Sequence, residues 1–275
     1  MSEWHDYTSG RQTHTVAGTL LIQKHVYSPQ LQNERSLLVW LPNSYDRKKR
    51  YPVIYMQDGQ NLFDAYTSFA GEWRVDETMI LLEDEGLEAI IVGIPNNDRR
   101  MFEYSPYPDH RLQVKAGSGD AYLSWMVETI KPMIDRDFCT IPDRKYTGIA
   151  GSSMGGLISL YGFLQHGATF GFAGVFSPAY WFGNQAIFQT IEQSPFVPGK
   201  IYLDIGSEEG DTRRKRKSTA PNYYLMAVRQ LSGRLIHKGY VPGQTLMYVE
   251  DQGGQHNEDA WARRLPGALR FLLRR

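Results

Sequence analysis

The stretch that decides the fold runs from Lys145 to His166 and reads KYTGIAGSSMGGLISLYGFLQH. Its first six residues favour a β-strand, and a helical pattern begins directly after the sequence Gly-Ser-Ser-Met-Gly. This is a G-x-S-x-G motif between a strand and a helix, the setting in which the motif marks a serine nucleophile on a sharp turn. Such a turn leaves no room for side chains two residues away, which accounts for Gly151 and Gly155 around Ser153. A Gly-rich loop is the alternative, and the downstream residues favour the nucleophile.

The composition is that of a globular protein with balanced charge. The 275 residues include 30 basic and 30 acidic side chains, and 41% of the chain is hydrophobic. Zero formal net charge gives no bulk attraction to nucleic acid or to an anionic membrane. Cys139 is the only cysteine, which excludes an internal disulfide and a multi-cysteine metal site. Without a recognisable signal peptide or an apolar run of ~20 residues, we expect a cytoplasmic protein.

Strands and helices alternate from residue 51 to the C-terminus. Predicted strands cover residues 51–58, 87–95, 145–150, 172–176, 200–205 and 245–249. Predicted helices cover residues 71–85, 120–135, 154–166, 186–193, 221–238 and 257–273. An antiparallel hairpin of 16–27 and 36–41 precedes them, and 96–119 is a predicted loop. The alternation favours one α/β domain over residues 1–275, with a mostly parallel sheet and helices on both faces.

A serine nucleophile needs a general base and an acid that orients the base. In enzymes built on a nucleophile elbow the chain order is serine, acid, histidine, and three histidines follow Ser153. His166 lies at the far end of the elbow helix, and His237 ends a later helix. His256 lies in the Gly-rich loop EDQGGQHNE after the last strand, at the sheet edge where catalytic groups gather. We therefore predict that His256 is the base.

The acid is expected after the preceding strand, in the sequence IYLDIGSEEGD of residues 201–211. Glu209 lies just past the strand end and is our preferred candidate. Asp204 lies inside the strand, so its side chain points to a face of the sheet. Glu208, Asp204 and Asp211 remain alternatives, and any of the four carboxylates could also be a solvated loop charge.

Two backbone N–H groups are predicted to bind the oxyanion. One belongs to Met154, directly after the nucleophile, where the positive end of the helix favours negative charge. The other belongs to Gln60, in the sequence DGQN after the first parallel strand. We expect Gly59 to let the backbone turn that N–H inward. An Asp-Gly turn that merely closes the strand is the alternative.

Two further stretches mix aromatic and charged side chains at the expected active-site edge. They read NNDRRMFEYSPYPD, residues 96–109, and SPAYWF, residues 177–182. Aromatic walls with a few charges suit an aryl or acidic substrate, and ordinary loop packing is the alternative. The residues expected to bind substrate are Asp58, Asn61, Arg99, Arg100, Tyr104, Tyr180 and Trp181.

A basic run, RRKRK at residues 213–217, can be interpreted as a nucleic-acid patch. On a neutral chain a solvated lid loop is the better interpretation. Such a loop could also attract an anionic substrate.

Several motifs together resemble the putative-esterase family of α/β-hydrolases, which includes esterase D, feruloyl and acetyl-xylan esterases and enterochelin esterases. They are YMQDGQN (55–61), GIPN (93–96), EYSP (103–106), GSSMGG (151–156), GSEE (206–209) and GGQHNE (253–258) with Trp261. The resemblance covers roughly residues 35–275 and implies an α/β-hydrolase fold and hydrolysis of carboxylic esters. It also implies an acid three residues past the strand-end glycine, here Glu209, where many members carry aspartate. Enterochelin esterases have an additional N-terminal domain, so their specialised role is not implied.

The sequence thus predicts a serine carboxylesterase that forms an acyl-enzyme on a small-molecule ester. Neither a metal nor an organic cofactor is expected, and no nucleic-acid or membrane partner is expected. The alternatives are an acyltransferase on the same fold, a serine peptidase and a binding protein with an inert serine. The acyl and alcohol parts of the substrate stay open, as does the oligomeric state, for which a homo-oligomer is one alternative.

Overall fold

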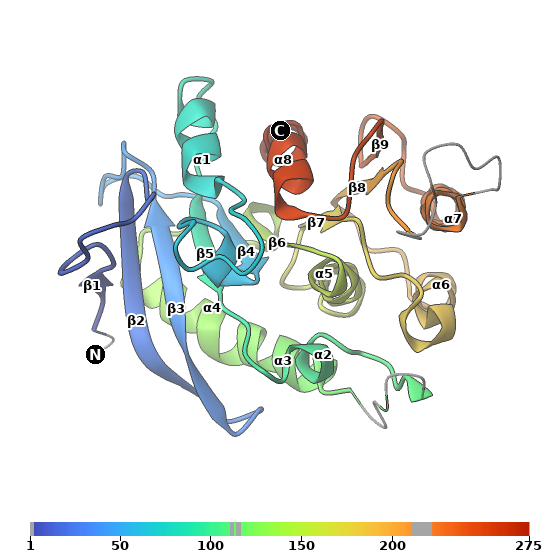
Figure 1. Cartoon of the computed structure of the whole chain (residues 1–275), viewed down its shortest axis with the longest axis horizontal. Coiled ribbons are helices and arrows are strands. Elements are labelled where there is room, and N and C mark those ends of the chain that lie inside the picture. Colours follow the sequence, from blue (N-terminus) through green and yellow to red (C-terminus); the bar gives the residue numbers. More distant parts are fainter. Residues whose placement is uncertain (1–2, 111–112, 114–116, 211–221, 275) are drawn as a thin grey trace.

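A sheet of nine strands forms the centre of the structure (Figure 1). The computed structural model describes residues 3–110, 113, 117–210 and 222–274. The strands are β1 (His5–Asp6), β2 (Thr19–Ser28), β3 (Asn33–Leu41), β4 (Val53–Gln57), β5 (Ile90–Ile94), β6 (Thr147–Ser152), β7 (Phe172–Phe176), β8 (Lys200–Gly206) and β9 (Leu246–Asp251). Their spatial order is β1-β2-β3-β5-β4-β6-β7-β8-β9.

The sheet is antiparallel at one end and parallel over the rest. β1, β2 and β3 pair antiparallel, and β3 also pairs antiparallel with β5. The strands from β4 to β9 pair parallel. This arrangement confirms the predicted hairpin and mostly parallel sheet. The chain moves from β4 to β5 on one side and then returns to β6 on the other side. The strand order therefore reverses at β4 and β6, and ligands of open parallel sheets bind at such a reversal.

Helices cover both faces of the sheet. They are α1 (Val75–Glu83), α2 (Arg100–Glu103), α3 (Gly119–Trp125), α4 (Lys131–Asp137), α5 (Met154–Gln165), α6 (Ala186–Gln193), α7 (Tyr223–Lys238) and α8 (Glu258–Leu273). Figure 1 shows α1 and α8 on one face and α3, α4 and α5 on the other. Along β4, Ile54 and Met56 pack with α1 and α8, whereas Val53 and Tyr55 pack into the opposite core. This alternation follows from the two-residue period of a strand.

Three expectations about local structure need correction. The predicted helix at 120–135 is divided into α3, a π-helical turn (Met126–Ile130) and α4. Pro132 in the first turn of α4 explains the division, because its ring lacks an N–H and clashes with the carbonyl four residues earlier. The helix expected at 71–85 begins only at Val75, after Arg74 in the left-handed region with φ 54°. The loop expected at 96–119 contains α2.

Among the described helices, none is both long enough and apolar enough to cross a lipid bilayer.

Candidate active site

Ser153 lies on a strained turn between β6 and α5. Its backbone has φ 55° and ψ −120°, a conformation that L-residues rarely adopt. The Ser153 N–H donates to the carbonyl of Phe176, at 3.0 Å, which ties the turn to the end of β7. A Cβ at Gly151 would lie 2.8 Å from both the Gly155 carbonyl carbon and Gln57 Cγ. The expected exclusion of a side chain is confirmed at Gly151, whereas at Gly155 a Cβ would be tight, 3.0 Å from Gln57 Cβ.

His256 lies in the loop between β9 and α8, and Glu209 lies behind it. Glu209 Oε2 is 2.7 Å from His256 Nδ1. The Glu209 side chain is 1% exposed and the imidazole 40% exposed, so the ring has one buried edge and one accessible edge. The ring also packs edge-on against Trp261, with centroids 5.0 Å apart. A buried carboxylate at Nδ1 leaves Nε2 as the nitrogen that can exchange a proton with a ligand.

The other candidate acids lie elsewhere. Asp204 is buried within β8 and accepts a hydrogen bond from the Ser177 N–H at 2.8 Å, and among the described residues it makes no contact with His256. Glu208 is within 3.5 Å of the side-chain amide of Gln255. Asp211 and the basic run at 213–217 lie outside the described residues.

Glu209 is held by donors on its second oxygen. Glu209 Oε1 accepts hydrogen bonds from the Gly206 N–H at 2.7 Å and from Ser177 Oγ at 2.6 Å. Ser177 Oγ in turn accepts from Trp261 Nε1 and from Arg264 Nη2, each at 3.0 Å. The chain of donors fixes the direction in which Oε2 points. Sequence reasoning missed the contribution of Ser177 and Arg264, although each lies in or beside a stretch that it had singled out.

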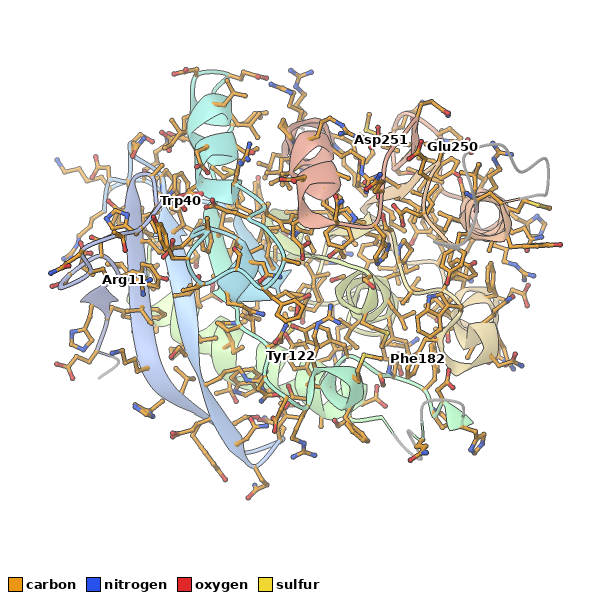
Figure 2. The ribbon with its side chains drawn as sticks, viewed as in Figure 1. Arg11, Trp40, Tyr122, Phe182, Glu250 and Asp251 are labelled. Atoms are coloured by element: carbon orange, nitrogen blue, oxygen red, sulfur yellow. The ribbon has the colours of Figure 1, made fainter. Side chains whose placement is uncertain are left out.

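Arg264 is a buried cation among three carboxylates. Its side chain is 4% exposed, and its nitrogens lie 2.9 Å from Asp204, 3.4 Å from Asp251 and 3.6 Å from Glu209. Asp251 ends β9 and lies between that strand and α8 (Figure 2). Burial raises the pKa of Asp204 to about 7, and the positive charge of Arg264 opposes that rise. Arg264 therefore compensates the buried negative charge beneath the Glu209–His256 pair.

Ser153 and His256 line the same pocket, of about 440 Å³. Its other lining residues are Asp58, Gln60, Asn61, Phe69, Ala70, Asn96, Arg100, Ser152, Glu258 and Trp261. These residues come from the end of β6, from the segments that follow β4 and β5, and from the start of α8, so the pocket lies where the strand order reverses at β4 and β6. The pocket is the concave, mixed polar and aromatic site that a small ligand requires.

The two amides expected to bind an oxyanion belong to segments at this pocket. Met154 begins α5, so its N–H has no carbonyl partner within the helix. Gln60 belongs to a 3₁₀ turn (Gly59–Asn61) directly after β4. The reason given for Gly59 needs correction: the positive φ, 56°, is at Asp58. Gly59 is required because a Cβ there would lie 2.6 Å from the backbone of Gly93.

The residues expected to bind substrate divide into two groups. Asp58, Asn61 and Arg100 line the pocket. Arg100 donates to both Asp58 oxygens, at 2.7 and 2.8 Å, so these two charges form one rigid unit. Tyr104 is fully buried, and its hydroxyl accepts from the Asp58 N–H at 3.1 Å. Tyr104 thus lies beneath the pocket and supports Asp58.

The remaining three residues of that set do not line this pocket in the described structure. Arg99 is exposed at the start of α2. Tyr180 is buried against Phe188 and Tyr224, and Trp181 packs beside Phe182. Glu258, which sequence reasoning missed, does line the pocket, and burial raises the pKa of its carboxyl group.

The comparison with protein families matches residues 28–272 to the family described as "Putative esterase". The chain belongs to this family. Among curated relatives is YbbA, an uncharacterized protein of Bacillus subtilis strain 168; it is 29% identical over 247 residues, which cover 86% of this chain and 92% of YbbA. A siderophore enterobactin esterase of Emericella nidulans is 24% identical over 206 residues, covering 65% of each protein.

The chain also resembles solved structures over most of its length. The BES protein from Bacillus cereus superposes with a TM-score of 0.71 at 21% identity, covering 91% of this chain and 94% of that protein. At this identity the likeness concerns the fold alone. The α/β-hydrolase fold expected from the sequence is confirmed.

In this esterase-family chain, replacing Arg264 by alanine is expected to destabilise the fold by about 3–5 kcal/mol, because buried carboxylates would lose their compensating cation. Urea unfolding at neutral pH measures the change. Arg263, the neighbouring arginine, is 59% exposed and also pairs with Asp251. Arg263→Ala is therefore the matched control and is expected to cost at most about 1 kcal/mol. Equal losses in the two variants would contradict the role assigned to Arg264.

Proposed function

We propose that this chain is a serine carboxylesterase whose nucleophile is Ser153. The observation that carries the proposal is the pocket that Ser153 and His256 share, with Glu209 buried 2.7 Å behind the imidazole. Membership of the esterase family supports hydrolysis of esters. The curated relative from Emericella nidulans, named an enterobactin esterase, adds support for a small-molecule ester as substrate.

The proposed reaction begins with transfer of the Ser153 hydroxyl proton to His256 Nε2. Ser153 Oγ attacks the ester carbonyl carbon, and the carbonyl electron pair moves to the oxygen. The N–H groups of Met154 and Gln60 stabilise that oxyanion. Glu209 accepts the Nδ1–H and stabilises the imidazolium. When the tetrahedral intermediate collapses, His256 protonates the departing alkoxide and the acyl group remains on Ser153.

Water completes the cycle. His256 Nε2 takes a proton from a water molecule, whose oxygen attacks the acyl carbon. A second tetrahedral intermediate collapses, the carboxylic acid leaves and the proton returns to Ser153 Oγ. The residues named here account for each proton transfer, so the proposed reaction uses neither a metal nor an organic cofactor.

Labelling with a fluorophosphonate tests the proposal. We expect a single adduct by intact mass on the wild type and none on Ser153→Ala, because only an activated serine attacks the phosphorus centre. Ser159 is a matched control, since it is a fully buried serine on α5 whose hydroxyl has no hydrogen-bond partner among the described residues. Ser159→Ala should label like the wild type. Folded wild-type protein that takes no label would refute the serine mechanism.

A further inference from the structure

Three acidic side chains meet at the start of α1, outside the catalytic machinery. One carboxylate oxygen from each of Glu72, Asp76 and Glu77 lies within 4.8 Å of the corresponding oxygens of the other two. Asp76 is fully buried, Glu72 is 8% exposed and Glu77 is exposed. The group therefore consists of two buried carboxylates and a third that is exposed to solvent.

Two buried oxygens of this group lack a partner. Asp76 Oδ2 accepts from the Ala17 N–H at 2.7 Å, and Glu72 Oε2 accepts from Thr15 Oγ1 at 3.0 Å. Asp76 Oδ1 and Glu72 Oε1 are buried and have no hydrogen-bond donor among the described residues. A buried carboxylate oxygen without a donor or a counter-charge is costly. These two oxygens therefore need a partner that the described residues do not supply.

The surrounding charges compensate the group only in part, since Arg74 opposes the rise in the pKa of Glu72. Arg11, on the N-terminal segment, pairs instead with Asp64 at 3.0 Å. Burial, together with the neighbouring Glu77 side chain, raises the pKa of Asp76 to about 9, and burial also raises the pKa of Glu72. The electrostatic cost is relieved either by a proton shared within the group or by a bound cation.

We propose that Glu72, Asp76 and Glu77 bind one calcium ion. All three residues offer carboxylate oxygens, the donors that hard cations such as Ca²⁺ and Mg²⁺ prefer, and the group contains neither histidine nor cysteine. Mg²⁺ requires near-ideal octahedral geometry and is usually held by one or two carboxylates, whereas Ca²⁺ accepts six to eight oxygens in flexible geometry, so three converging carboxylates suit Ca²⁺. Glu77 opens the site to solvent, and water completes the coordination shell.

The two buried carboxylates join segments that are distant in sequence, because they accept hydrogen bonds from Thr15 and Ala17 of the N-terminal segment. A calcium ion that fixes the carboxylates would therefore also stabilise the contact between that segment and the start of α1. The acidic group is also connected to the Ser153 pocket. Trp73, which follows Glu72, packs against Trp261, with ring centroids 5.7 Å apart, and Trp261 lines that pocket. The proposed site is thus structural, and it does not depend on the proposed esterase activity.

Calorimetric titration of the EDTA-stripped full chain with CaCl₂ tests this site. We expect one equivalent of Ca²⁺ to bind, Mg²⁺ to bind at least tenfold more weakly, and Ca²⁺ to raise Tm by several degrees. Ca²⁺ should also slow hydrogen exchange of the Ala17 amide. A wild type that shows neither binding heat nor a Tm shift overturns the proposal and leaves the shared proton as the explanation.

Variants distinguish Ca²⁺ binding at these three carboxylates from non-specific binding of Ca²⁺ to surface carboxylates. Asp76→Asn is expected to abolish binding, and Glu77→Gln, at an exposed position that does not endanger folding, should raise Kd at least tenfold. Asp84 is an exposed carboxylate that follows the end of the same helix, so Asp84→Asn is the control and should bind Ca²⁺ like the wild type. Unchanged Ca²⁺ affinity in Glu77→Gln would overturn the proposal, even if Asp76→Asn failed to fold.

Discussion

Replacing His256 by alanine is expected to lower kcat about 10⁴- to 10⁶-fold, because the same imidazole serves as base and then as acid in each half of the proposed reaction. The contact with Glu209 at 2.7 Å gives the ring its orientation, and its 40% exposure makes the other edge available to substrate. Steady-state hydrolysis of p-nitrophenyl acetate measures the effect. The Glu209 carboxylate cannot substitute, since it is buried behind the ring.

His237 provides the control for this experiment. It lies exposed in the last turn of α7, outside the residues that line the pocket. His237→Ala should leave kcat unchanged. If the two histidine variants lost activity to the same small extent, the general base would have to be another group.

Replacing Glu209 by glutamine is expected to lower kcat about 10⁴-fold while the fold stays intact. The structure dictates how the new amide would lie. Oε1 accepts from the Gly206 N–H and from Ser177 Oγ, so the amide oxygen must occupy that position. The amide NH₂ would then face His256 Nδ1 and force the tautomer that carries its proton on Nε2. An imidazole in that tautomer cannot accept the proton of Ser153.

Glu208 supplies the matched comparison, one residue earlier in the same turn. Its side chain lies near Gln255 and makes no contact with His256 among the described residues. Glu208→Gln should retain wild-type kcat. A loss in Glu208→Gln equal to the loss in Glu209→Gln would reassign the acid.

Only part of the pocket could be predicted from the sequence. Asp58, Asn61 and Arg100 follow strand ends. Because groups at the carboxyl ends of parallel strands lie close together, this position was enough to predict that the three residues line the pocket. Tyr104 follows the same rule in sequence, but its ring is fully buried beneath Asp58. Glu258 was missed because it belongs to the first turn of α8, and its exposure to the pocket depends on how that helix meets the sheet.

The sequence by itself determined those strands, turns and helices that residues close to one another in the chain specify. The strand, turn and helix around Ser153 are one example, because the Gly-Ser-Ser-Met-Gly motif stands directly between a strand pattern and a helical pattern. The atoms that leave no room for a Cβ at Gly151 and Gly155 belong largely to Gln57 of β4, so that part of the cause is tertiary. The parallel strands are another, since continuous apolar runs such as residues 90–94 can only be buried on both faces. His256 could be selected from the order of residues along the chain.

The tertiary structure decided everything that depends on which distant segments meet. Sequence position favoured Glu209 among four carboxylates near the end of β8 but left the other three open, and only the approach of the β9–α8 loop brings Glu209 to His256. Arg264 compensates Asp204 from 60 residues away. Glu72 and Asp76 receive donors from the N-terminal segment more than 50 residues earlier. Long-range contacts of this kind leave no periodic signal, because the residues between them are free to vary in number and composition.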